Sequence, residues 1–310
     1  MIVTVYIITY MKFDTLYQTI SSVLRQDYSS IELFVSDDGS PSFPYQKVVD
    51  YIEKNKKDNI ISYYVLNNKE NVGTVRHINN ILKSAHGDLY IPLAGDDAFF
   101  NENVISRIVG TYNKTHFKVL STSRALYLKE NEYMALMPHY GSRKRIARLM
   151  ATAEQQHKMY TECKDMEFAS GSAMAYEAAF LREMNYFDER YRLWEDGPFI
   201  NKMTSRGFPI TTAYDIISIK YKGGGISTTQ NPIMRKDLYI FNTTDRRVSA
   251  GHYGLFHQRI LQYTYLKFLN CSFFKHILYK LQYPDVVIDQ LFYKYREKIA
   301  SRYDIKHIKS

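Results

Sequence analysis

The sequence of residues 89–97, Leu-Tyr-Ile-Pro-Leu-Ala-Gly-Asp-Asp, carries the strongest structural signal in this 310-residue chain. Its apolar run predicts a buried strand, and the glycine and two aspartates predict an acidic turn directly after it. Adjacent carboxylates repel each other, so Asp96 and Asp97 need a cation or hydrogen-bond donors to offset their charge. Mg2+ or Mn2+ would do this with oxygen ligands and would keep positions open for phosphate oxygens. A solvated turn in which an Asp caps the next helix is the alternative, and for an isolated Asp pair it is the commoner case.

The residues before this stretch alternate between strand and helix patterns. Strands are expected at 3–8, 31–35 and 60–66, and helices at 14–26 (capped by Asp14), through Val48 and Ile52, and at 74–84. Such alternation predicts βαβ units and a mostly parallel sheet. Right-handed crossovers then bring the carboxyl ends of the strands to one edge, where open α/β sheets bind ligands. Tyr10 after the first strand, Asp37-Asp38 after the second and Asp96-Asp97 after the fourth are therefore expected to meet there.

Two further groups near this edge are candidate nucleotide contacts. In the turn Asp37-Asp38-Gly39-Ser40 an Asp would accept hydrogen bonds from a base N–H or a ribose hydroxyl, and a plain Asp-Gly turn is the alternative. Arg76 lies in the first turns of the helix after Asn71-Val72-Gly73-Thr74, where N–H groups and a guanidinium suit a diphosphate. A solvent-facing Arg76 is the alternative, and His77 is expected to be structural.

The second half of the chain has fewer clear patterns. Residues 124–165 are interpreted as a variable insertion or loop-helix segment, and order returns at 168–176. Trp194-Glu195-Asp196-Gly197 contains the only Trp, and a carboxylate beside a bound sugar can act as general base for an incoming hydroxyl. Its alternative is a helix start in which Asp196 caps residues 198–203. The basic, glycine-rich residues 220–227 predict either a loop that closes over a phosphate or a plain linker.

Taken in order, these motifs resemble the family 2 glycosyltransferases, whose fold is called GT-A, from Val3 to about Ser227. The matching stretches are Val3–Tyr10, Ser21–Gln26 with Ile31–Ser40, Asn71–Gly73 with Arg76 and Asn79, Gly87–Ile91 leading to Asp96-Asp97, and Phe187-Asp188-Glu189 with Glu195-Asp196. Five ordered motifs are a specific match. The resemblance implies an α/β fold with a mostly parallel, nucleotide-binding central sheet flanked by helices.

The resemblance also implies a role for particular residues. It assigns the nucleotide, with uracil as base, to Thr9, Tyr10, Asp38, Arg76 and Asp96, and a divalent cation (Mn2+ or Mg2+) to Asp96 and Asp97. Asp196 would be the catalytic base with Glu195 in support, and Trp194 would contact the acceptor. Such enzymes invert the anomeric carbon as the nucleotide diphosphate leaves, and the metal offsets the charge that develops on it.

Three departures from the family pattern matter. Ala94 stands where the family often has the first Asp of an Asp-x-Asp-Asp motif, so metal binding rests on Asp96 and Asp97, and which of them touches the ion is left open. Ile8 stands at the usual Pro. No Gln-x-x-Arg-Trp motif and no membrane span are found, which favours the addition of single sugars over processive synthesis.

Composition bounds the class of protein. The chain is 45% hydrophobic and 24% charged, which predicts a folded protein. Cys163 and Cys271 fit neither a zinc spacing nor a disulfide framework, and no signal peptide is evident, so a cytoplasmic location is expected. Only the net charge of +9 supports a nucleic-acid binder. A dinucleotide-dependent oxidoreductase is not favoured, because no Gly-x-Gly-x-x-Gly motif follows the first predicted strand. A non-catalytic nucleotide-sugar-binding or scaffold protein with the same fold remains the main alternative.

The domain prediction is a catalytic domain at 1–228, with a nucleotide-sugar half at 1–100 and an acceptor half at 101–228, and a helical region at 229–310. From Gly251 to Ser310 there are ten Lys and Arg against four acids, interleaved with apolar and aromatic residues. Such a region is expected either to lie on the anionic inner face of the plasma membrane, next to a glycan or polyprenyl-linked acceptor, or to pack on the catalytic domain or another copy.

Overall fold

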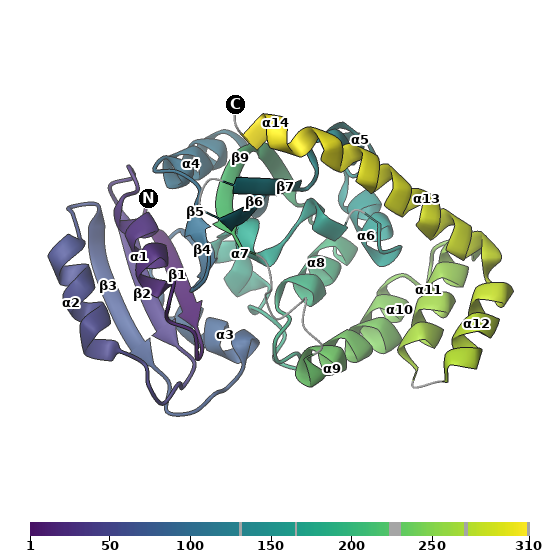
Figure 1. Ribbon diagram of the computed structural model, residues 1–310, viewed down its shortest axis with the longest axis horizontal. Helices are drawn as coiled ribbons and strands as arrows, with labels where there is room; N and C mark the ends of the chain where they lie inside the picture. The colour runs from purple at the N-terminus through teal and green to yellow at the C-terminus, as the bar shows by residue number, and fades with distance from the viewer. Residues whose placement is uncertain (130–131, 165, 223–230, 270–271, 309–310) are drawn as a thin grey trace.

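The computed structural model describes residues 1–129, 132–164, 166–222, 231–269 and 272–308 (Figure 1). A sheet with the strand order β3-β2-β1-β4-β8-β6-β9-β5 runs through the catalytic part, and β7 pairs with β6 outside this path. The strands are β1 (Val3–Thr9), β2 (Ile31–Asp37), β3 (Ile60–Asn67), β4 (Leu89–Ala94), β5 (Ala98–Phe99), β6 (Val119–Lys129), β7 (Glu132–Met137), β8 (Met174–Glu177) and β9 (Thr211–Tyr221). The α/β class predicted from the sequence is confirmed.

The first half of the sheet follows the predicted pattern. Strands β3, β2, β1 and β4 pair in parallel, and Val5 of β1 lies between Leu33 and Ile91 of its neighbours. Helices α1 (Leu16–Leu24), α2 (Tyr45–Asn55) and α3 (Thr74–Ser84) connect them. The predicted Asp14 cap is wrong, because α1 begins after Thr15 and has no side-chain cap.

The second half of the sheet is mixed: β6 and β9 pair in parallel, and the other four pairings are antiparallel. In the whole sheet four of the eight strand pairings are therefore parallel and four are antiparallel. The remaining helices of this part are α4 (Val104–Thr115), α5 (Arg143–Leu149), α6 (Ala153–Thr161), α7 (Ala178–Glu183) and α8 (Asp196–Ser205). Residues 124–165, interpreted as a variable insertion or loop-helix segment, do contain the helices α5 and α6, but the interpretation missed the hairpin of β6 and β7 that precedes them.

Strand β6 escaped the sequence patterns because three consecutive buried positions in it are hydroxyls. Ser121, Thr122 and Ser123 are buried, and each side chain donates to a backbone carbonyl of a neighbouring segment at 2.6–2.9 Å. Hydrogen bonding lets polar side chains occupy a sheet interior where a periodicity search expects apolar ones.

The chain ends in helices that wrap one side of the catalytic part (Figure 1). They are α9 (Pro232–Ile240), α10 (Arg246–Ser249), α11 (Leu255–Phe268), α12 (Phe273–Gln282), α13 (Pro284–Ala300) and α14 (Asp304–Ile308), and a π-helical turn, Phe241–Asp245, joins the first two. No helix in the described part of the chain combines the length and apolarity needed to cross a membrane.

Helix α14 anchors the far end of this region on β7. The buried Asp304 carboxylate accepts the N–H of Leu136 at 3.0 Å and of Tyr140 at 2.7 Å, and His139 Nδ1 lies 2.6 Å from it. The hydrogen bond to Asp304 raises the pKa of His139. The C-terminal helices therefore pack on the catalytic part. The predicted boundary at residue 228 falls within 223–230, outside the described residues, and stays a prediction.

Candidate active site

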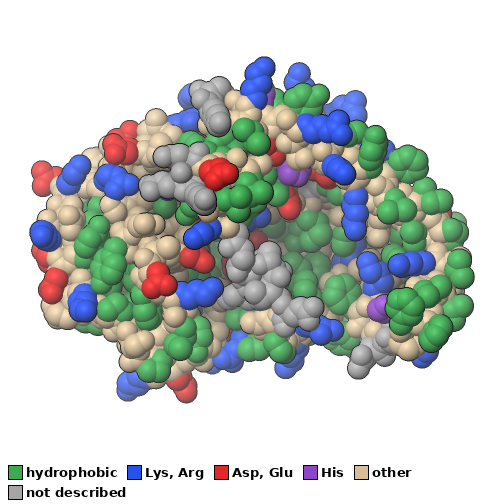
Figure 2. Space-filling view, in the orientation of Figure 1, with side chains coloured by type: hydrophobic (Ala, Val, Ile, Leu, Met, Phe, Trp, Pro, Cys, Tyr) green, Lys and Arg blue, Asp and Glu red, His purple; other side chains and the backbone are tan. Residues whose placement is uncertain are grey.

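A cavity of about 680 Å3 lies beyond the carboxyl ends of β1 and β4. In Figure 2 the molecule is hollowed at its centre, between the N-terminal half and the C-terminal helices. Seven of the nine predicted site residues line the cavity: Thr9, Tyr10, Asp38, Asp96, Trp194, Glu195 and Asp196. Residues almost two hundred positions apart in the chain thus line one cavity. For Tyr10, Asp38 and Asp96 this is the meeting at one edge of the sheet that the strand order predicted.

Asp38 holds the backbone that forms one wall of the cavity. Its carboxylate accepts the N–H of Val72 at 3.0 Å and of Gly73 at 2.9 Å, and the side-chain amide of Asn68 at 2.9 Å. Gly39 is required in the same turn, since its φ is +83° and an added Cβ would lie 2.5 Å from the carbonyl carbon of Glu70. Asp38 is therefore oriented by at least three donors before any ligand binds.

His77 completes this wall as a structural residue, as expected. The Asn68 amide donates to its Nδ1 at 2.8 Å, and its Nε2 donates to the Ser36 carbonyl at 3.2 Å. Burial lowers the pKa of His77, so the ring is neutral at pH 7.

Thr9 and Tyr10 form the neighbouring rim. The Thr9 carbonyl accepts the N–H of Asp38 at 3.0 Å, and Thr9 Oγ1 donates to the carbonyl of Lys12 at 2.9 Å. Tyr10 is 49% exposed. Its ring is thus available to pack against a planar ligand group above Asp38.

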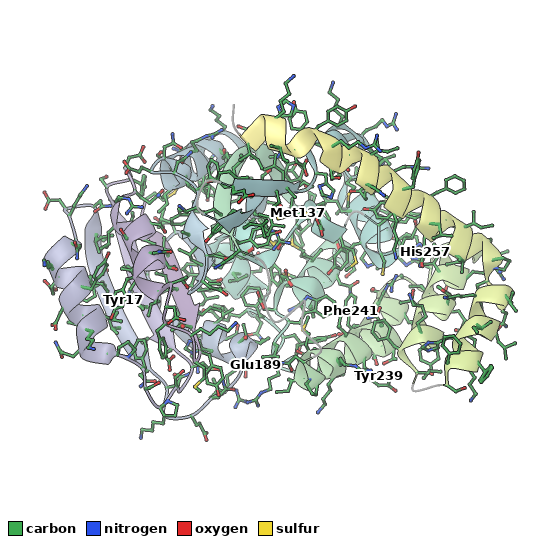
Figure 3. All side chains as sticks on the ribbon, viewed as in Figure 1. Tyr17, Met137, Glu189, Tyr239, Phe241 and His257 are labelled. Carbon is green, nitrogen blue, oxygen red and sulfur yellow. The ribbon has the colours of Figure 1, made fainter. Side chains whose placement is uncertain are left out.

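Arg76 does not line the cavity. Its side chain is 61% exposed, and Nε donates to Glu189 Oε2 at 3.1 Å (Glu189 is labelled in Figure 3). Asn71 and Thr74 line the cavity from this segment instead. The predicted contact of Arg76 with the nucleotide stays a prediction. It would require the Arg76 side chain to break its ion pair with Glu189.

The predicted metal pair lies between two cavities. Asp96 is exposed and lines both the central cavity and a second one of about 540 Å3, whereas Asp97 lines the second alone. Burial, and then the charge of Asp96, raise the pKa of Asp97 to about 7, and Arg124 opposes this. Within the described ranges no group of three or more His, Cys, Asp and Glu side chains is placed to hold a metal ion. Two carboxylates remain, and they are hard oxygen donors that fit Mg2+ or Mn2+ when other ligands come from a phosphate or water.

Arg124 is a cavity residue that the sequence analysis missed. It extends from β6 into the lining, its guanidinium carbon lies 4.7 Å from the ring centroid of Tyr221, and Nη1 is 3.4 Å from Ser172 Oγ. Its Nε is buried without a hydrogen-bond partner. A buried donor left unpaired beside a cavity suits an anionic ligand. No sequence signal distinguished this arginine, because it lies in the stretch taken for an insertion.

Two adjacent carboxylates, Glu195 and Asp196, form another part of the cavity wall. Asp196 Oδ2 accepts the N–H of Gly171 and Oδ1 accepts the N–H of Gly197, each at 2.7 Å, at the first turn of α8. Burial, and then the charge of Asp196, raise the pKa of Glu195 to about 8. A Cβ on Gly171 would lie 2.8 Å from Glu195 Oε1, so the backbone approaches both acids closely.

Trp194 is held from the C-terminal region. Its ring packs edge-on against Phe241 (labelled in Figure 3), with centroids 4.9 Å apart. The buried Asp237 carboxylate of α9 accepts the N–H of Arg192 at 3.0 Å, of Leu193 at 2.7 Å and of Trp194 at 3.2 Å. Helix α9 therefore positions the segment that carries the acids, a role the sequence analysis did not anticipate for residues after 228.

The glycine-rich segment predicted to close over a phosphate, Gly223-Gly224-Gly225 with Ser227, lies outside the described residues. So does Cys271, whereas Cys163 is a free cysteine.

Solved structures share this fold, which is that of GT-A glycosyltransferases. S. aureus TarS matches with a TM-score of 0.57 and 18% identity over 87% of this chain, which spans 43% of the TarS chain. TarS 1-349 in complex with UDP-GlcNAc matches with a TM-score of 0.58 and 18% identity, covering 87% of this chain and 72% of that one. The mannosyltransferase PcManGT from Pyrobaculum calidifontis, in complex with GDP-Man and Mn2+, matches with a TM-score of 0.54 and 15% identity, over 84% of this chain and 68% of that one.

The family follows from the sequence. A family model described as glycosyl transferase family 2 matches residues 4–184, more than half of the chain. The chain belongs to this family of glycosyltransferases, and the resemblance noted from its motifs is confirmed.

Proposed function

We propose that this protein is an inverting, non-processive glycosyltransferase that moves one sugar from a UDP-sugar to a hydroxyl group of a glycan or polyprenyl-linked acceptor. The observation that carries the proposal is the central cavity, which has Tyr10 and Asp38 at one wall and Glu195 and Asp196 at the other. A nucleotide at the first wall would present its sugar to the acids of the second. Bacterial capsule, O-antigen or related polysaccharide synthesis is the setting that suits such a reaction.

The donor would lie along the first wall. Tyr10 and Asp38 would hold the base, the Thr9 backbone would shape its pocket, and Asp96 would contact the ribose. The solved complex of TarS 1-349 with UDP-GlcNAc, whose fold this chain shares, supports uracil as the base. Lys12 and Arg124 are the cations in the described lining of the cavity, and Arg124, with its unpaired Nε, is the one proposed to meet the diphosphate.

Asp96 and Asp97 would hold Mn2+ or Mg2+, and their oxygen donors suit either ion. The Mn2+ in the solved PcManGT complex supports this assignment. When bound, the cation supplies positive charge that stabilises the leaving diphosphate. Ala94, which stands where the family often has another Asp, leaves the pair without a third carboxylate.

The second wall would carry the proton transfer. Asp196 takes the proton of the acceptor hydroxyl, the freed oxygen attacks the anomeric carbon, and the bond from that carbon to the diphosphate oxygen breaks. Attack from the face opposite the leaving group inverts the configuration. The N–H groups of Gly171 and Gly197 hold Asp196 in one orientation, and a protonated Glu195 spares the site a second negative charge. Trp194 offers an apolar face to the acceptor sugar.

A panel of nucleotide sugars tests the proposal, with donor hydrolysis and transfer measured with and without Mn2+. We expect a UDP-sugar to be the preferred donor and Asp196→Asn to lower turnover by at least about a hundredfold, the usual worth of a general base. Unchanged transfer by Asp196→Asn would rule out its role as base. Nucleotide-sugar binding without turnover by the unmodified protein would favour the non-catalytic binding protein instead.

A polyprenyl-linked acceptor resides in a membrane, so the enzyme would work at the cytoplasmic face of the bilayer. The basic C-terminal region is the part of the chain proposed to meet it.

A further inference from the structure

We infer that the outward faces of α12 and α13 form a docking surface for an anionic lipid bilayer. The inference specifies the residues through which the proposed enzyme reaches a membrane. It rests on the proposed function only for the nature of the acceptor.

Apolar side chains cover the outward faces of both helices. Eight of them have exposed fractions of 52–76%: Phe273, Phe274, Leu278 and Leu281 on α12, and Ile288, Leu291, Phe292 and Tyr295 on α13. The spacing on α13 is i, i+3, i+4 and i+7, which places its four residues on one side of the helix. Figure 2 shows apolar side chains gathered along the rim of the molecule where Figure 1 places these helices. An exposed apolar stripe of this length on two adjacent helices is typical of an interaction surface.

The opposite faces of the same helices pack on the protein. Tyr279 of α12, Tyr283 before α13, and Val286 of α13 cluster with Ile260 and Tyr263 of α11. The ring centroids of Tyr263 and Tyr283 lie 5.9 Å apart. Helix α13 is thus seated by one face and α12 by the partly buried Tyr279, and the exposed stripe is a second apolar surface of the two helices.

All three acids of α13 are paired with cations of the protein. Asp285 pairs with Arg259 at 2.7 Å and Asp289 pairs with Lys164 at 2.8 Å. Glu297 pairs with Arg145 and accepts the hydroxyl of Ser142 at 3.0 Å. The helix therefore presents no free carboxylate beside its apolar stripe.

The Lys and Arg side chains of α12 and α13, unlike the acids of α13, are exposed and lie beside the apolar stripe. In the part of the chain that the structure describes, no ion pair is recorded for the exposed side chains Lys275 and Lys280 of α12 or Lys294, Arg296 and Lys298 of α13. At 100° per residue, Arg296 flanks one side of the α13 stripe, and Lys294 and Lys298 flank the other. An apolar band with basic borders matches the acyl chains and anionic headgroups of a bilayer surface.

The same charges argue against a second copy of this chain as the occupant. A two-fold contact through these stripes would bring the basic borders of both copies together. Like charges facing across an interface oppose association, and no free acid on α13 offsets them.

Co-sedimentation of the full-length protein with vesicles tests the inference. We expect binding to vesicles that contain phosphatidylglycerol, weaker binding at high salt, and little binding to phosphatidylcholine alone. Phe274→Ser combined with Leu291→Ser should lower the fraction bound by at least about tenfold, and Lys294→Glu combined with Arg296→Glu should do the same. Ile61→Ser combined with Leu66→Ser, on the exposed face of β3, is the matched control and should bind as the unmodified protein does.

Point variants are preferable to a truncation, because removing the region would also remove Asp304 from β7. Retained donor hydrolysis shows that a variant has folded. Equal vesicle binding by the stripe variants, or no vesicle binding by the unmodified protein, would overturn the inference. So would a stable dimer in analytical ultracentrifugation that the stripe variants dissociate. Vesicle binding by a protein that transfers no sugar would leave the docking surface in place and refute the proposed function.

Discussion

Asp237 Oδ2 lies 2.7 Å from the amide nitrogen of Leu193, forty-four positions earlier in the chain. The same carboxylate also accepts the N–H groups of Arg192 and Trp194. One buried side chain of α9 thus orders the backbone that leads into Glu195 and Asp196. A residue of the region at 229–310, which was predicted to be separate from the catalytic domain, therefore helps to shape the site.

Asp237→Asn should lower turnover while leaving the fold in place. The amide keeps one acceptor oxygen but turns an NH2 group toward backbone N–H donors. Residues 192–194 would then lose hydrogen bonds that fix the position of Glu195. We expect kcat to fall by about tenfold or more with a smaller change in the donor KM, as for a misplaced catalytic group. Steady-state kinetics measure both.

The control for this substitution is Asp215→Asn, which removes an exposed carboxylate paired with Arg107. It should leave kcat unchanged. Equal effects of the two variants would refute a positioning role for Asp237.

Gly171→Ala tests the close approach of the backbone to Glu195 and Asp196. The new methyl would lie 2.8 Å from Glu195 Oε1 and 3.1 Å from Asp196 Oδ2, so one of the carboxylates must move. We expect transfer to fall by at least about tenfold, measured as kcat with saturating donor. Gly110→Ala in α4 is the matched control, because nothing lies within 4 Å of its added Cβ. It should keep full activity and raise the free energy of unfolding by about 0.5–1 kcal/mol.

Gly39→Ala tests the turn that carries Asp38. It imposes the cost of a positive φ and also drives a methyl into the backbone of Glu70 and Asn71. Gly207→Ala has a similar φ, +87°, but meets open space, so it measures the φ cost alone, about 1–2 kcal/mol. In denaturant titrations Gly39→Ala should lose clearly more stability, and binding of UDP should weaken only in that variant. Similar losses in both would show that contact with residues 70–71 contributes little.

Glu195 predicts a pH-dependent stability. Its pKa rises from 4.5 to about 8 on folding, so the native state holds a proton that the unfolded state releases. This contribution is fully present below pH 4.5 and is lost as the pH rises toward 8 and beyond. Glu195→Gln removes it, so the variant should gain stability relative to the unmodified protein between pH 6 and pH 9, by about 1 kcal/mol or more.

Thermal unfolding at several pH values measures this difference. Asp188 is a useful comparison, because hydrogen bonds from Arg190 outweigh burial and lower its pKa. Asp188→Asn should therefore show no such gain at high pH. A stability difference for Glu195→Gln that does not vary with pH would contradict the assignment.

The sequence by itself determined the first half of the fold and most of the site. Buried strands such as Val3–Thr9 and Leu89–Ala94 carry continuous apolar runs, and one helix connects each strand of this half to the next, so local pattern suffices to order a parallel sheet. The handedness of the crossovers then brings Tyr10, Asp38 and Asp96 to one edge without any further information.

Only the tertiary structure decided the rest, because those features depend on contacts between distant segments. Arg124 enters the cavity from a strand in which three consecutive buried positions are hydroxyls, and its proposed role follows from an unpaired Nε that no spacing reveals. Asp237 is an ordinary helical acid until α9 packs beneath residues 192–194. In the C-terminal helices both faces are apolar, so composition alone could not separate the seated face from the exposed one. The packing of α11 against one face of these helices decides which face is buried, and it leaves the apolar residues of the other face exposed.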